Sequence, residues 1–170
     1  MSEKEPLSIE RRAALKDQIN LAQKNAIGPA EADVVEYVNA EKMHKALASG
    51  ILDVEEFNSE YRASFKNPRN VICSNAEELA WVLREIDVDV RWAEHERAHW
   101  ETALSHGFEK PVVGVYFVSR RRSSYLEPVF FTLPGCIPEG MSGEAAVTAL
   151  RVIIGAPTNL SSSDKQMLGQ

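Results

Sequence analysis

The sequence predicts an α+β fold that is mostly helical and forms one domain over residues 1–170. Two observations indicate this class. Apolar residues recur at three- and four-residue spacing through most of the chain, which is typical of amphipathic helices. Two nearly continuous apolar runs, Val112–Val118 and Val129–Leu133, flank the polar segment Ser119–Leu126 and predict an antiparallel hairpin. We therefore expect helices combined with a small antiparallel hairpin or sheet.

Residues 1–65 are predicted to form a helical N-terminal part. Ser8 and Asp53 are residue types that cap helices, and each precedes a segment with apolar residues at helical spacing. Asn67-Pro68 then breaks the helical pattern, because the residue before a proline avoids the helical conformation. Three helices are expected in this part, over about 8–25, 30–49 and 53–65.

Residues 70–155 are predicted to form a helix–hairpin–helix core. The short apolar run Val71–Cys73 is of strand type, and Asn75 with Glu78 matches a capping box at the start of the next helix. Asp89 is expected to cap a second helix over about 90–106, which precedes the hairpin. Ser142 is expected to cap a further helix over about 143–154, and a last helical turn follows at 161–168.

Composition and charge exclude several classes of protein. The net charge of −6 disfavours a nucleic-acid partner, because an anionic surface gains little from contact with phosphates. Cys73 and Cys136 are too few and too far apart for a disulfide framework or a thiolate zinc cage. We find neither a signal peptide nor an apolar run near the ~18 residues of a membrane span. We therefore expect a cytoplasmic protein without a membrane partner; the sequence does not indicate its oligomeric state.

The sequence contains one constellation with clear chemical meaning. Three of its four histidines, His95, His99 and His106, lie in the helix predicted over 90–106. Residues four apart share one face of a helix, so His95 and His99 can converge on a single metal ion. Glu96 follows the first histidine directly, where its carboxylate can reach a metal-bound water.

His95-Glu96-Arg97-Ala98-His99 is an HExxH arrangement, and it resembles the active-site helix of the zincin metalloproteases. The resemblance covers these five residues only. It implies that His95 and His99 bind zinc, that Glu96 is the general base, and that the substrate is a peptide or protein. The first functional hypothesis is therefore a small zinc-dependent hydrolase, and the resemblance implies that it is a peptidase.

The third zinc ligand stays open at this point. His106 lies ~16 Å beyond His95 on a straight helix, so it can join only if the helix ends early and the chain folds back. A downstream carboxylate is the other type of candidate: Glu127 in the second strand of the hairpin, Glu109 or Glu139.

Two alternatives remain beside the hydrolase. A metal site filled entirely by protein ligands would be structural and would activate no water. A non-enzymatic interaction domain, in which the histidines only stabilise the fold, would use its N-terminal helices and a basic loop as binding surfaces. That loop carries Arg120, Arg121 and Arg122, which form a candidate contact for phosphate or an acidic partner. Trp81, Trp92 and Trp100 have helical spacing and are predicted to lie in the core.

Overall fold

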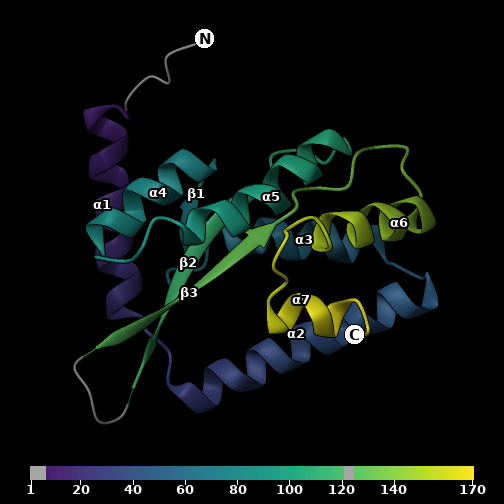
Figure 1. Ribbon diagram of the computed structural model, residues 1–170, viewed down its shortest axis with the longest axis horizontal. Helices are drawn as coiled ribbons and strands as arrows, with labels where there is room; N and C mark the ends of the chain where they lie inside the picture. Colours follow the sequence, from purple (N-terminus) through teal and green to yellow (C-terminus); the bar gives the residue numbers. More distant parts are fainter. Residues whose placement is uncertain (1–6, 121–124) are drawn as a thin grey trace.

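The computed structural model describes residues 7–120 and 125–170, apart from the side chains of residues 33–40. Its helices are α1 (Ile9–Lys24), α2 (Pro29–Ser49), α3 (Val54–Ser64), α4 (Ala76–Glu85), α5 (Trp92–Ser105), α6 (Gly143–Ile154) and α7 (Ser162–Met167). Its strands are β1 (Val71–Cys73), β2 (Val112–Ser119) and β3 (Leu126–Leu133). The predicted α+β class is confirmed, and Figure 1 shows the helices arranged around one small sheet.

Three helices begin where the sequence predicts, because their predicted N-caps form. The side chains of Ser8, Asp53 and Ser142 each accept a hydrogen bond from a backbone N–H in the first turn of α1, α3 and α6. Two predicted details are wrong. Asn75 caps α4 as predicted, because its side chain accepts from the Glu78 N–H, but the capping box is incomplete, because the Glu78 carboxylate accepts from the Ser74 N–H and from Arg11 instead. The helix α5 begins at Trp92, two residues later than predicted, so Asp89 does not cap it. The Asp89 carboxylate accepts instead from the N–H of Arg91, the residue before the helix.

The sheet has three antiparallel strands in the order β1-β2-β3. The central strand β2 pairs Val115 with Val71 of β1 on one side and with Phe130 of β3 on the other. Most of β2 is buried, whereas every residue of β3 keeps part of its surface exposed. The central strand β2 is therefore covered on both faces, whereas β3, at the edge of the sheet, is covered only in part.

Two apolar clusters form most of the core, and α5 contributes to both. Ala93, in the first turn of α5, is buried in the cluster that α1, α4 and one face of the sheet share. Ala103, near the end of α5, is buried in the cluster built around α6 and the end of α2. A helix that is packed at two places along its length has a fixed position, so the side chains between these contacts are held in place. Those side chains include the HExxH residues.

A buried ion pair joins α1 to the start of α4. The Arg11 guanidinium donates two hydrogen bonds to Glu78, from Nε to Oε2 at 2.7 Å and from Nη2 to Oε1 at 2.8 Å. Arg11 also donates to the carbonyl of Ile72 in β1 at 3.2 Å. This contact therefore fixes α1 against both β1 and α4.

Within the described residues, we find no helix that combines the length and apolar character needed to cross a membrane.

Candidate metal centre

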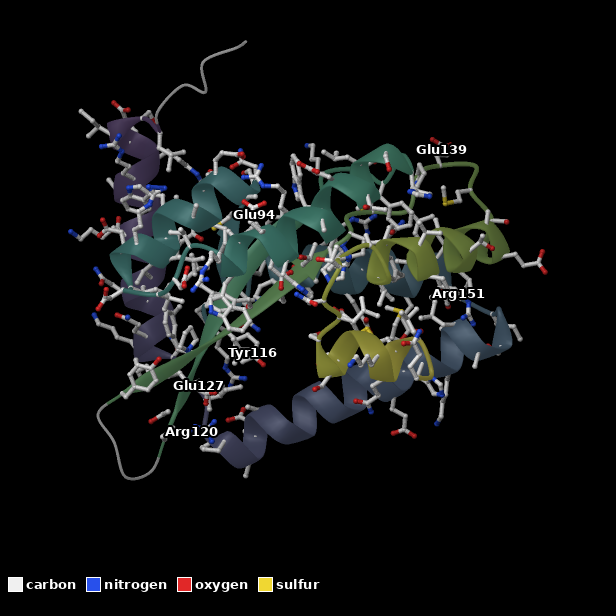
Figure 2. All side chains as sticks on the ribbon, in the orientation of Figure 1. Glu94, Tyr116, Arg120, Glu127, Glu139 and Arg151 are labelled. Carbon is white, nitrogen blue, oxygen red and sulfur yellow. The ribbon has the colours of Figure 1, made fainter. Side chains whose placement is uncertain are left out.

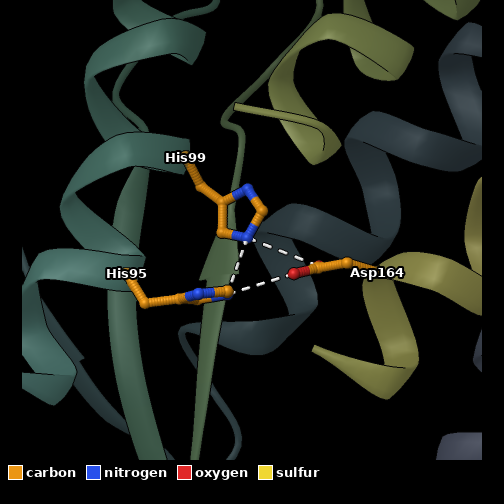
Figure 3. A group of neighbouring side chains, drawn as sticks. All are labelled: His95, His99 and Asp164. Carbon is orange, nitrogen blue, oxygen red and sulfur yellow. Dashed lines mark hydrogen bonds and ion pairs between the residues drawn. The ribbon is translucent and has the colours of Figure 1, made fainter. Parts of the chain in front are cut away.

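Three potential metal ligands meet between α5 and α7 (Figure 3). His95 and His99 project from one face of α5, as their spacing predicts. Asp164 reaches them from α7, which lies more than 50 residues later in the sequence. The two Nε2 atoms of the histidines lie 3.3 Å apart. Asp164 places Oδ2 at 3.0 Å from Nε2 of His95 and Oδ1 at 3.4 Å from Nε2 of His99. One ligand atom from each of the three residues lies within 4.8 Å of the others.

The separation of the two histidine nitrogens fits a tetrahedral metal ion. Ligand atoms bound at 2.0–2.1 Å around a tetrahedral centre lie about 3.3 Å from one another, as the bond lengths of zinc to nitrogen and oxygen require. The separation of 3.3 Å between the two Nε2 atoms lies close to this value. Asp164 faces the two histidines with different oxygens, and one ligand atom from each of the three residues lies within 4.8 Å of the others. A small movement of the side chains would bring one carboxylate oxygen and both nitrogens to tetrahedral spacing, with one position free of ligands from this group.

A carbonyl group behind His99 sets the orientation of its ring. Nδ1 of His99 lies 2.8 Å from the carbonyl oxygen of Ile153, at the end of α6. A carbonyl only accepts hydrogen bonds, so Nδ1 carries a proton and Nε2 is the ring nitrogen that faces Asp164 and His95 and could bind a metal ion. Metal-binding histidines usually have such a partner on the nitrogen that does not face the metal.

The fold of α7 places the carboxylate of Asp164. Ser161 caps α7, because its hydroxyl accepts from the Asp164 N–H at 3.1 Å, and Asp164 Oδ2 in turn accepts from the Ser161 N–H at 3.1 Å. Met167 and Leu168 pack against the cluster around α6 and hold this short helix on the body of the protein. The carboxylate is therefore oriented before any metal binds.

Hydrogen bonds and burial shift the pKa values of two of these groups in opposite directions. Burial by itself lowers the pKa of His99, but its contacts with Asp164 and with the Ile153 carbonyl outweigh burial and raise it. Burial by itself raises the pKa of Asp164, but its contacts with His99 and with Ser161 outweigh burial and lower it. Asp164 is therefore ionised at neutral pH, as a metal ligand must be.

Glu96, which directly follows His95 in the motif, is buried and lies on the side of α5 that faces the sheet. Its carboxylate accepts a hydrogen bond from the hydroxyl of Thr132 in β3. Burial raises the pKa of Glu96 above its ordinary value. The hydrogen bond from Thr132 and the two nearby histidines lower this pKa, but burial outweighs them. A carboxylate with a raised pKa in a sheltered position is suited to accepting a proton.

None of the sequence-predicted third ligands joins His95 and His99 among the described residues. α5 ends at Ser105, so His106 caps the helix and its Nδ1 lies 2.9 Å from the carbonyl of Thr102. Glu127 forms an ion pair with Arg120 at the distal part of the hairpin, and Figure 2 shows both side chains there. Glu109 is held in a bridge with Cys136 on the chain after α5, and Glu139 is exposed at the far end of the molecule in Figure 2.

Asp164 is the candidate ligand that sequence reasoning missed. The signal that the sequence carries is the pair Ser161 and Asp164 at the start of the last helical turn, which matches a capping box. That pattern predicts a helix start and says nothing of a contact with α5, because the contact depends on how α7 packs.

The structure corrects the prediction that all three tryptophans lie in the core, and it describes only part of the basic loop. Trp81 and Trp100 pack against the core as predicted, but Trp92 is 58% exposed. Of the arginines in the loop, Arg120 is the one described, and it forms an ion pair with Glu127. Arg121 and Arg122 lie outside the described residues.

Comparisons with protein-family models, with curated proteins and with solved structures found no match to this chain. The interpretation of the centre therefore depends on its own geometry and chemistry.

Proposed function

We propose that this protein is a zinc-dependent hydrolase that cleaves amide bonds, with peptides or proteins as its substrates. The observation that carries the proposal is the convergence of His95, His99 and Asp164, whose ligand atoms lie within 4.8 Å of one another, with Glu96 of the same motif beside them. Two imidazoles and one carboxylate, with a fourth position open, form a donor set that catalytic zinc sites use.

The charges of the site favour a divalent cation. Asp164 and Glu96 bring two acidic side chains to a largely buried region, and the contacts of Asp164 with His99 and Ser161 hold its pKa below the ordinary value. A divalent ion would balance negative charge that is costly to bury alone. Zinc bound there would lower the pKa of a water molecule and polarise the carbonyl of a substrate.

The proposed hydrolysis uses Glu96, Thr132 and the carbonyl of Ile153. The water oxygen forms a bond to the carbonyl carbon while its proton moves to the Glu96 carboxylate, and the same proton passes to the nitrogen as the carbon–nitrogen bond breaks. The products are a carboxylic acid and an amine, so no oxidant or other co-reactant is required. Thr132 holds the Glu96 carboxylate by donating a hydrogen bond to it, and the Ile153 carbonyl keeps His99 in the tautomer that binds metal.

The test begins with a metal count on the protein purified without a histidine tag. After dialysis against trace zinc, mass spectrometry should find about one zinc per chain, and His99→Ala and Asp164→Asn should lose it. His106→Ala is the matched control, because His106 lies on the same helix but outside the group. Thermal melting shows whether each variant is folded.

Activity is then measured on a peptide library. Glu96→Gln should keep its zinc and lose at least about 100-fold in rate, because the proton acceptor is removed while the ligands stay in place. A wild-type protein with no more zinc than His99→Ala contradicts the proposal, and so does a Glu96→Gln variant with unchanged cleavage.

A further inference from the structure

Trp92 is a large aromatic residue that stays exposed next to the candidate centre. At the start of α5 it keeps 58% of its surface exposed, although tryptophan is usually largely buried. Val90, two residues before it, is also exposed. An exposed apolar surface beside a sheltered polar site is typical of a place where a ligand binds.

The position of Trp92 relative to the site follows from two contacts between α5 and β3. The Trp92 ring stacks on Phe130 with a centroid separation of 6.0 Å and an interplanar angle of 27°. One helical turn further on, Glu96 accepts the hydrogen bond from Thr132. Phe130 and Thr132 are two residues apart in β3 and therefore point to the same face of the sheet.

These two contacts place the Trp92–Phe130 pair next to Glu96. Four residues of helix advance about 6 Å and two residues of strand about 7 Å, so the two contacts lie side by side at nearly equal spacing along both elements. Trp92 is also three residues before His95 and four before Glu96, and both spacings make side chains neighbours on a helix. Figure 1 shows α5 running along β3, in agreement with this arrangement.

We propose that Trp92 and Phe130 form an apolar subsite that binds a large apolar or aromatic group next to the scissile bond. This inference rests on the proposed function, since it names the substrate class of the same centre. The exposed ring gives an apolar group flat contact area, and the stacked Phe130 holds that ring in place. Substrates with a bulky apolar side chain beside the cleaved bond are then favoured over substrates with a small or charged one.

The test uses metal-directed probes, so it needs no knowledge of the natural substrate. Acetohydroxamic acid and 3-phenylpropanohydroxamic acid carry the same zinc-binding group and differ mainly in the phenyl group. Calorimetry on the zinc-loaded protein should show that the phenyl compound binds at least about tenfold more tightly, as expected from the apolar area that a phenyl ring buries.

Trp92→Ala should remove most of this difference and leave the affinity for acetohydroxamic acid unchanged. Leu104→Ala is the matched control, because Leu104 is an exposed apolar residue near the other end of α5. It should keep the preference for the phenyl compound. Zinc content is measured for each variant.

The outcomes separate this inference from the proposed function. Equal affinity of the wild-type protein for the two probes overturns the subsite and leaves the metal centre intact. Equal weakening of both probes in Trp92→Ala also overturns it, because that result indicates a structural role for Trp92. A protein that binds neither zinc nor either probe overturns the proposed function itself.

Discussion

Replacing Glu78 by glutamine should destabilise the fold, because Glu78 is the buried acceptor of the ion pair that joins α1 to α4. Its side chain is 5% exposed, and it accepts from Arg11 and from the Ser74 N–H. Glutamine keeps the shape and one acceptor oxygen but removes the negative charge that faces the guanidinium. A hydrogen bond to a charged group contributes ~1.5–3 kcal/mol, and breaking one side of a fully buried pair costs more.

The expected loss is at the lower end of these values, since Arg11 is 32% exposed and water solvates it in part. We expect Glu78→Gln to lower the free energy of unfolding by about 2 kcal/mol at pH 7, as measured by urea titration. For a chain of this size the melting temperature should fall by about 4–8 °C. Glu85→Gln, an exposed change in the same helix, should have almost no effect.

The pH dependence gives this prediction a second check. Burial alone raises the pKa of Glu78, but the hydrogen bonds from Arg11 and Ser74 outweigh burial and hold the pKa below its ordinary value. A lowered pKa in the folded state stabilises the protein fully above the unfolded pKa of about 4.3, and this stabilisation is lost as the pH falls through the folded pKa. The difference between wild type and Glu78→Gln should therefore be constant from pH 7 to about pH 5 and shrink in stronger acid. A variant as stable as wild type at pH 7, or a difference that grows in acid, would refute the reasoning.

Two further predictions concern the sheet and the thiols. Gly114→Ala should lower the free energy of unfolding by about 1–3 kcal/mol, because its Cβ would lie 2.5 Å from the Phe131 ring and 2.6 Å from the Val71 carbonyl oxygen; unchanged stability in urea would contradict the observed pairing of β1 with β2. In the native protein a thiol reagent such as DTNB should modify Cys136 and leave Cys73 unmodified until the protein unfolds, because burial raises the pKa of the Cys73 thiol and blocks access to it. Rapid reaction of two thiols per native chain would be inconsistent with this burial.

The parts of the fold that depend on local sequence were predictable. Caps such as Ser8 and Ser142 act within one turn of the helix that they start, so the residues around them are sufficient to place each helix. The pairing of His95 with His99 is predictable for the same reason, since it depends only on the period of the helix. The sequence also suggested that Val71–Cys73 forms a strand, but its place beside β2 required the packed structure.

The exposure of Trp92 could not be predicted from helical periodicity. The helical spacing of Trp92 relative to Trp81 and Trp100 supported a place in the core, although its position on the helical wheel is close to that of His99 and Ala103. A wheel gives the direction of a side chain but not its position along the axis. Because Trp92 is the first residue of α5, it lies at the end of the helix, where fewer neighbouring elements cover it.

Asp164 was hidden for a different reason, which follows from its two roles. One carboxylate oxygen, Oδ2, accepts from the Ser161 N–H and also faces His95, while Oδ1 faces His99. In the sequence, the capping role explains the residue completely, so nothing about Asp164 indicates a second role. In the structure, the cap is what aims the carboxylate, because the hydrogen bond to Ser161 restricts its rotation. The formation of α7 and the completion of the centre are therefore linked: the last short helix has to fold against the body of the protein before His95 and His99 acquire their third partner.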